Sequence, residues 1–96
     1  MKRVLVPIAH GTEEMEAVTI IDILRRAGLM VHVSKVFGSE PDDSLRCEMS
    51  RGVIVQADDS IETHKDETFD CICLPGGMKG AQTFVKSDIL VSLLKR

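Results

Sequence analysis

Two apolar segments, each leading into a glycine-containing turn and then a helix, constrain the fold of this chain more than any other feature. Residues 4–8 precede Gly11, and residues 70–74 precede Gly76 and Gly77. Short continuous apolar runs are typical of strands that a parallel sheet buries on both faces. The pattern therefore predicts an α/β protein in which strands lead directly into helices.

The residues after the first apolar run predict a β-α-β unit. Thr12 is expected to cap a helix that continues to about Ala27, with acidic residues in its first turn and Gly28 as its left-handed stop. Residues 30–36 alternate as a strand does. Such a unit favours a parallel sheet with a right-handed crossover.

The remaining segments are assigned from turn and capping signals. Arg51 and Gly52 lie in the predicted turn of a small hairpin, and Ser87 is the expected cap of the last helix. The expected elements are a polar loop (38–44), the hairpin strands (45–49 and 53–56), an irregular or briefly helical stretch (58–68), and two helices (79–85 and 87–95).

Size and charge exclude several functional classes. The 96 residues form at most one domain, with 44% hydrophobic and 28% charged residues and a net charge of −3. Because the chain has no basic stripe, no Trp and no Tyr, nucleic-acid binding is not expected. No run approaches the roughly 20 apolar residues of a membrane span, and Glu13, Glu14 and Glu16 follow the first apolar run too soon for a signal peptide. We expect a cytoplasmic protein.

The three cysteines are expected to be reduced thiols, because their number is odd and no secretion signal precedes them. Cys71 and Cys73 are two residues apart on a predicted strand, so they point to the same face and are interpreted as core residues. No further ligands stand at metal-binding spacing near them, so no metal site is predicted. Cys47 falls in a hairpin strand, and none of the three lies at a strand-to-helix elbow suited to a nucleophile.

Glu16 is the strongest single candidate for chemistry. On a helix it would share a face with positions 20, 23, 24 and 27, all apolar, so a carboxyl group would continue an apolar stripe. A carboxyl group in such a place can share a proton with a nucleophile. The alternative is that Glu16 lies at the edge of the stripe and reaches solvent.

The glycine pair after the second apolar run can aim backbone N–H groups at a ligand. Gly76 and Gly77 stand between a strand and a helix, where oriented amides hold an anion or stabilise an oxyanion. The spacing matches neither the dinucleotide fingerprint nor the phosphate loop. The alternative is a tight turn without a ligand.

Other candidates carry weaker signals. His10 follows the first strand, where α/β sheets place ligand groups, although a solvated loop histidine is the simpler interpretation. Arg51 could pair with a carboxylate across an interface or remain solvated. His32 and His64 are given no role.

Two motifs together resemble the ThiJ/PfpI superfamily, most closely the branch of the parkinsonism-associated protein deglycase. They are residues 11–18 (Gly-Thr-Glu-Glu-Met-Glu-Ala-Val) and residues 74–77 (Leu-Pro-Gly-Gly) with residues 80–82 (Gly-Ala-Gln). Residues 23–28 and 50–53 resemble the same branch, so the resemblance covers essentially the whole chain.

The resemblance implies a flavodoxin-like fold, related to class I glutamine amidotransferases. It implies that Glu16 is the protonated carboxyl group beside a nucleophilic cysteine and that Gly77 offers an oxyanion-hole N–H. It also implies a homodimer through the first helix and the hairpin, with Arg51 and Arg26 at the interface. The implied activity is cofactor-free: a thiolate adds to methylglyoxal or its protein adducts, with chaperone and redox-sensing roles besides.

The chain departs from the family pattern in one respect. The strand that carries the family's reactive cysteine corresponds to sequence beyond Arg96, so no cysteine here can take that role. Two interior strands and a final apolar helix stripe also leave much surface uncovered. We therefore expect residues 1–96 to be the N-terminal half of one domain, inactive alone and completed by a C-terminal half. The alternative is a non-enzymatic short form that acts as a binding or chaperone-like module.

Overall fold

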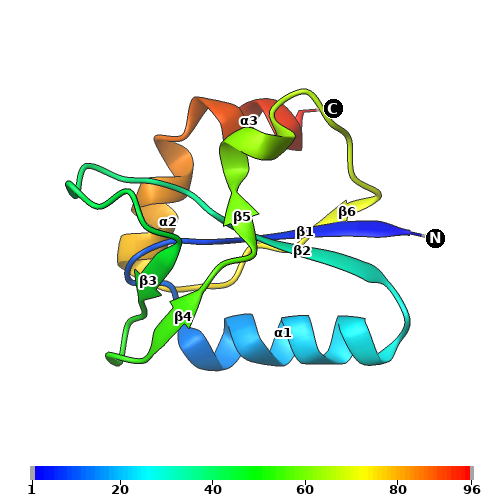
Figure 1. The fold of residues 1–96 in the computed structure, drawn as a ribbon, viewed down its shortest axis with the longest axis horizontal. Helices are drawn as coiled ribbons and strands as arrows, with labels where there is room; N and C mark the ends of the chain where they lie inside the picture. The colour runs from blue at the N-terminus through cyan, green and yellow to red at the C-terminus, as the bar shows by residue number, and fades with distance from the viewer. Residues whose placement is uncertain (1, 96) are drawn as a thin grey trace.

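The computed structural model describes residues 2–95 and shows a parallel sheet between helices (Figure 1). The elements in chain order are β1 (Arg3–Ile8), α1 (Glu14–Arg26), β2 (Met30–Lys35), β3 (Arg46–Glu48), β4 (Ile54–Gln56), β5 (Asp59–Ser60), the 3-10 helix η1 (Ile61–His64), β6 (Cys71–Ile72), α2 (Met78–Val85) and α3 (Asp88–Leu94). In this part of the chain the main sheet has the order β5-β2-β1-β6, and all its pairings are parallel. The predicted fold class is confirmed.

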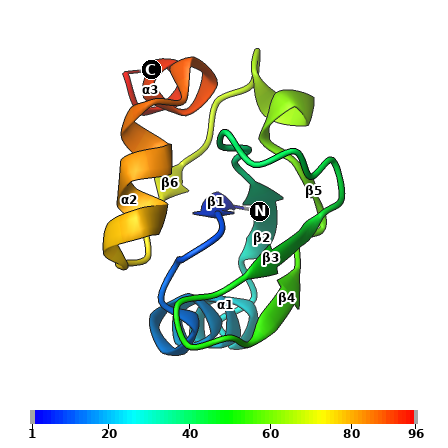
Figure 2. The same ribbon diagram turned by 90° about the vertical axis from the view of Figure 1, so that its left-hand side faces the viewer.

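The sheet separates two cores of buried side chains. Figure 2 shows α1 and α3 on opposite sides of β1 and β2. Side chains of β1 alternate: Val4, Val6 and Ile8 pack on the α1 side, whereas Leu5 and the following Ala9 pack toward α2 and α3. Because both faces of β1 are covered, its continuous apolar run is explained by burial on two sides. β1 and β2 pair along their whole length, from Arg3 opposite Met30 to Ile8 opposite Lys35.

The start of α1 differs from the prediction. Glu13, not Thr12, is the N-cap, and its carboxylate accepts the N–H of Met15 at 3.4 Å. The hydroxyl of Thr12 is buried and instead accepts the N–H of Ala9 at 3.0 Å. Because the hydroxyl of Thr12 is occupied within the loop, the N-cap is the next residue, Glu13. The stop at Gly28, with φ of 85°, is as predicted.

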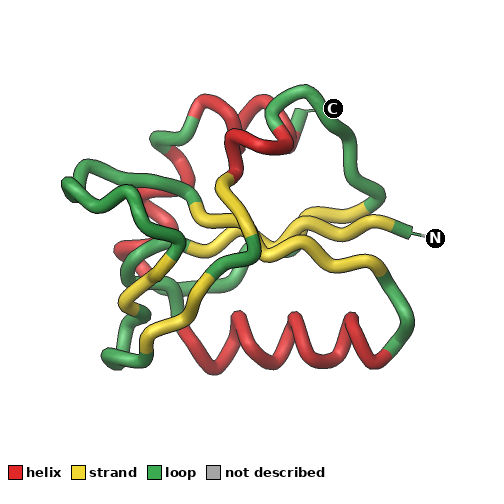
Figure 3. Tube along the Cα trace, in the orientation of Figure 1, coloured by secondary structure: helices red, strands yellow, loops and turns green. Residues whose placement is uncertain are grey.

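The hairpin and the last helix form where the sequence predicted them. β3 and β4 pair antiparallel beside the carboxyl end of β1, where Figure 3 shows them apart from the main sheet. Ser87 caps α3 by accepting the N–H of Leu90 at 3.2 Å. The stretch expected to be irregular or briefly helical contains β5 and η1, and the strand expected at 70–74 is reduced to β6. Within residues 2–95 every helix is too short or too polar to span a bilayer.

Candidate functional site

Glu16 and Gly76 meet at the carboxyl end of the sheet. Because β1 and β6 are parallel neighbours, the loop entering α1 and the turn entering α2 lie at the same edge. Gly76 donates its N–H to Oε1 of Glu16 at 3.0 Å, although 60 residues separate the two. A second bond joins the same segments, since the N–H of Glu13 donates to the carbonyl of Gly76 at 2.9 Å. The structure thus places two predicted site residues in direct contact.

Gly77 has a backbone that requires glycine. Its φ is 112°, and a Cβ would lie 2.6 Å from the carbonyl oxygen of Gly11 and 2.8 Å from the nitrogen of Glu13. It is also the N-cap of α2, where the helix dipole favours negative charge. The N–H of Gly76 is occupied by Glu16, whereas that of Gly77 makes no hydrogen bond within residues 2–95. Gly77 therefore offers a free N–H donor beside a carboxyl group.

Glu16 lies at the border of the packed face of α1 and is itself exposed. The predicted buried stripe is partly wrong, because Ile23 is 58% exposed and Ala27 is exposed too. The side chains that pack on the sheet are Ala17, Ile20, Ile21 and Leu24. The true face is centred one position further along the helix. That offset turns Glu16 away from the core and toward the turn after β6.

The close approach of α2 to the loop before α1 was not foreseen from the sequence. A Cβ on Gly80 would lie 2.6 Å from Oγ1 of Thr12 and 3.1 Å from its Cα. Gly80 is buried within α2, so the helix packs directly on the loop that leads to Glu16. A glycine inside a helical pattern was the available signal for such packing.

Glu14 holds the hairpin against α1. Its carboxylate accepts the hydroxyl of Ser50 at 2.9 Å and the backbone N–H groups of Arg51 at 2.9 Å and Val53 at 3.3 Å. Desolvation alone would raise the pKa of the Glu14 carboxyl group. The hydrogen bonds from the hairpin, together with one from the backbone N–H of Glu14 itself, have the larger effect and lower this pKa to about 2. The sequence placed Glu14 only in the first turn of a helix and did not indicate this anchoring role.

The two candidate interface arginines lie apart from Glu16. The exposed Arg51 borders, with Gly11, Ser50 and Met78, a shallow hollow beside the turn into α2. Arg26 is at the far end of α1, where its Nε lies 2.9 Å from Oδ1 of Asp22. Among the described residues neither guanidinium contacts Glu16. Their role at an interface stays a prediction.

His10 is part of the framework rather than a solvated loop residue, so the simpler interpretation was wrong. Its Nδ1 accepts the N–H of Glu48 at 3.0 Å, and its Nε2 lies 3.1 Å from Oδ2 of Asp42. The accepting Nδ1 leaves the proton on Nε2, which donates to the carboxylate. His10 thereby ties the end of β1 to the hairpin and to the preceding loop. A pocket-lining role for His10 stays untested.

The cysteines divide into one buried thiol and one neighbouring pair. Burial raises the pKa of Cys47 to about 11, which makes this thiol a poor nucleophile. Cys71 and Cys73 share a face as predicted, with their Sγ atoms 3.7 Å apart. The interpretation of both as core was wrong for Cys71, which is exposed at the edge strand β6. Burial, together with the adjacent Cys71, raises the pKa of Cys73.

A second cluster lies away from Glu16, on residues to which the sequence gave no role. His32, Asp59 and His64 come from β2, β5 and η1 and bring their ligand atoms within 4.8 Å of one another. Their spacing along the chain matches no metal motif, so only the fold brings them together.

The comparisons with known proteins identify the family. A protein-family model described as the DJ-1/PfpI family matches residues 2–96. The chain belongs to the DJ-1/PfpI family. The solved structure "Toxoplasma gondii DJ-1, oxidized" superimposes with a TM-score of 0.90 and 49% identity, over 99% of this chain and 49% of that one. This family membership confirms the resemblance and the flavodoxin-like fold.

Two curated relatives carry names that bear on function. The "Parkinson disease protein 7 homolog" of Danio rerio is 43% identical over 95 residues, which cover 98% of this chain and 48% of that protein. The "Glutathione-independent glyoxalase DJR-1.2" of Caenorhabditis elegans is 28% identical over 86 residues, covering 90% of this chain and 42% of that protein. The chain thus spans about half the length of these DJ-1/PfpI relatives.

Proposed function

We propose that this chain supplies the acid and the backbone donor of a cysteine-dependent glyoxalase or deglycase site. The observation that carries the proposal is the contact between the Glu16 carboxyl group and the turn at Gly76, beside the free N–H of Gly77. A carboxyl group and an oriented amide are two of the three parts that thiol addition to a carbonyl requires. The glyoxalase name of the Caenorhabditis elegans relative supports the substrate class.

In the proposed reaction a cysteine thiolate attacks the aldehyde carbon of methylglyoxal. A C–S bond forms, the carbonyl π electrons move to oxygen, and the N–H of Gly77 stabilises the resulting oxyanion. Glu16 exchanges the proton with the thiol and the adduct. The hemithioacetal isomerises to a lactoyl thioester by transfer of a proton from the first to the second carbon, and water then cleaves the C–S bond and releases lactate and the thiol. The net reaction, methylglyoxal plus water giving lactic acid, needs no external oxidant or reductant.

The attacking cysteine is proposed to come from a segment equivalent to the half of the relatives that this chain does not span. Cys47 is unsuited because burial raises its pKa, and no hydrogen bond in the described part of the chain joins Cys71 or Cys73 to Glu16. The edge strand β6 and the exposed Leu74 and Met78 offer a surface for that C-terminal half.

The test begins with the intact masses of all polypeptides that co-purify with the native protein, followed by an assay of lactate formed from methylglyoxal. We expect a companion segment and turnover that Glu16→Gln lowers by about 100-fold or more. The matched control is Asp66→Asn, an exposed carboxylate in the loop after η1. If a single species of this chain's mass is folded and inert, the enzymatic proposal fails and the binding or chaperone-like module remains.

We also propose that α1 and the hairpin form a homodimer interface. Met15, Val18 and Ile23 on α1, and Val53 and Ile54 near and in β4, are between 47% and 72% exposed. Exposed apolar side chains gathered on adjoining elements mark an interaction surface. Val18→Asp should yield a monomer in sedimentation velocity, whereas Val85→Asp, at an exposed position of α2, should leave the dimer intact. A monomeric parent protein would refute the interface.

The proposed location is the cytoplasm. Cys47, Cys71 and Cys73 are all free thiols in the structure, including two that lie close together. A reducing compartment keeps such thiols unpaired. Retention of all three thiols can be followed by thiol titration of the protein from unstressed cells whose thiols are blocked at lysis. Recovery of a Cys71–Cys73 disulfide there would contradict this location.

A further inference from the structure

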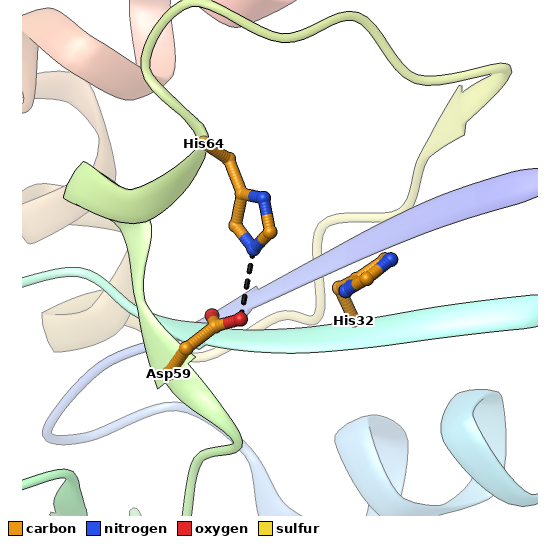
Figure 4. A group of neighbouring side chains, drawn as sticks. All are labelled: His32, Asp59 and His64. Atoms are coloured by element: carbon orange, nitrogen blue, oxygen red, sulfur yellow. Dashed lines mark hydrogen bonds and ion pairs between the residues drawn. The ribbon is translucent and has the colours of Figure 1, made fainter.

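Three polar side chains converge at one edge of the sheet, away from Glu16. His32 and Ser34 lie on the same face of β2 because side chains alternate along a strand, and Asp59 of β5 pairs opposite Ser34. η1 follows β5 directly and ends at His64. Figure 4 shows His64 reaching from η1 toward Asp59, with His32 beside them on β2.

The distances are close to those of a metal site. Nε2 of His64 lies 2.9 Å from Oδ2 of Asp59, and the ligand atoms of all three residues lie within 4.8 Å of one another. Four ligand atoms around zinc, with bonds of about 2.1 Å, stand about 3.4 Å apart. Closing the set from a spread of 4.8 Å therefore requires side-chain adjustments of about 1.4 Å.

The ring of His32 has an unusual feature. Its Nε2 is buried and has no hydrogen-bond partner among the described residues. Buried side-chain nitrogens are nearly always paired, so an unpaired one needs an explanation. One ring nitrogen of His32 lies within 4.8 Å of the ligand atoms of His64 and Asp59. An imidazole beside a second imidazole and a carboxylate has the chemistry of a metal ligand.

The surroundings also match a metal site. Nδ1 of His64 lies 3.0 Å from Oε1 of Glu67, which orients the ring so that Nε2 faces Asp59. The hydroxyl of Ser34 donates to Oδ1 of Asp59 and leaves Oδ2 facing the histidines. Phe69 packs edge-on against both imidazoles, with centroids 5.7 and 5.3 Å away. Outer carboxylates and an apolar wall of this kind orient and dry protein metal centres.

We propose that His32, Asp59 and His64 bind one zinc ion, with a solvent molecule in the fourth position. Two imidazoles and one carboxylate suit zinc, and three protein ligands leave one position open. The ion would join β2, β5 and η1, and so fasten the segment that leads to β6. The proposal is independent of the glyoxalase activity and revises the expectation that no metal is bound.

The test uses the chelator-treated native protein, with Zn²⁺ and Co²⁺ as probes. We expect one equivalent of Zn²⁺ to bind and to raise the unfolding temperature with increasing metal concentration. His32→Asn and Asp59→Asn should each weaken binding by at least about 100-fold, whereas the outer-shell change Glu67→Gln should weaken it by about 10-fold. If His32→Asn does not fold, Asp59→Asn decides, because the amide keeps the shape of the side chain.

The matched control tests whether zinc binds instead to the neighbouring thiols of Cys71 and Cys73, since thiolates are also zinc ligands. Cys71→Ser combined with Cys73→Ser should leave Zn²⁺ affinity unchanged, and bound Co²⁺ should show ligand-field bands without a thiolate charge-transfer band. Failure of the folded parent protein to bind Zn²⁺ would overturn the proposal. So would binding that survives both ligand variants, or a charge-transfer band that disappears in the double cysteine variant.

Discussion

Replacing Gly77 by alanine should be the most damaging single change in the turn that holds Glu16. A φ of 112° is strained for any residue with a Cβ, at a cost of about 1–3 kcal/mol. The new Cβ would also lie 2.6 Å from the carbonyl oxygen of Gly11 and 2.8 Å from the nitrogen of Glu13. Both obstacles are backbone atoms, so the loop itself has to move, at a further cost of about 1–3 kcal/mol.

Gly52→Ala provides the matched control for Gly77→Ala. Gly52 has a φ of 89°, but a Cβ there would meet nothing within 4 Å. Both variants place a Cβ on a residue with a positive φ, but only in Gly77→Ala does that Cβ overlap with backbone atoms. We expect Gly77→Ala to lower the free energy of unfolding by about 2–6 kcal/mol, and by at least about 1 kcal/mol more than Gly52→Ala.

Urea unfolding followed by far-UV circular dichroism measures both changes, provided that the m-values agree. In thermal unfolding, a difference of 1 kcal/mol corresponds to a midpoint difference of about 4–8 °C for a domain of this size. Equal losses in the two variants would refute the reasoning, because they would show that the loop before α1 does not press on Gly77.

Two further predictions concern polar groups that brace the hairpin. Lys35 is 1% exposed, and its Nζ donates to Oδ2 of Asp42 and to the carbonyls of Ser44 and Arg46. Lys35→Met should lower the free energy of unfolding by about 1.5–3 kcal/mol, because it removes hydrogen bonds made by a charged group. A loss below about 1 kcal/mol in urea titration would contradict the bracing role. Glu14 has a folded pKa of about 2, below its ordinary 4.5, so the stability it contributes is complete above pH 4.5 and is lost as the pH falls through about 2. Urea midpoints measured across that window should fall more steeply for the parent protein than for Glu14→Gln, and parallel profiles would count against the anchor.

The elements with strong periodicity were predictable, because local patterns carry them. The apolar run of β1, the stop at Gly28 and the cap at Ser87 all depend on neighbours in sequence, and all three were found. Thr12 was misassigned as a cap because two local bonds compete for its hydroxyl. The bond to Ala9 forms in a loop that lies against α2 at Gly80, a contact whose sequence signal was a glycine within a helical pattern.

In the candidate site, too, the individual residues were predictable from local patterns, whereas their contacts were not. Residue type and spacing singled out Glu16, Gly76 and Gly77, because a carboxyl group on a helix face and a glycine turn have recognisable local forms. Their contact across 60 residues depends on the parallel pairing of β1 with β6, which aligns the carboxyl ends of the two strands. The use of the Gly76 N–H by Glu16, which leaves that of Gly77 free, is likewise a result of packing.

The sequence by itself determined the α/β class, the family and the individual parts of the site, since these depend on short-range patterns. Only the tertiary structure decided which side chains meet. It turned Glu16 toward the glycine turn, made Glu14 the anchor of the hairpin, and exposed Cys71 at the sheet edge. It also gathered His32, Asp59 and His64, because strand pairing and the 3-10 turn join positions that no sequence motif relates.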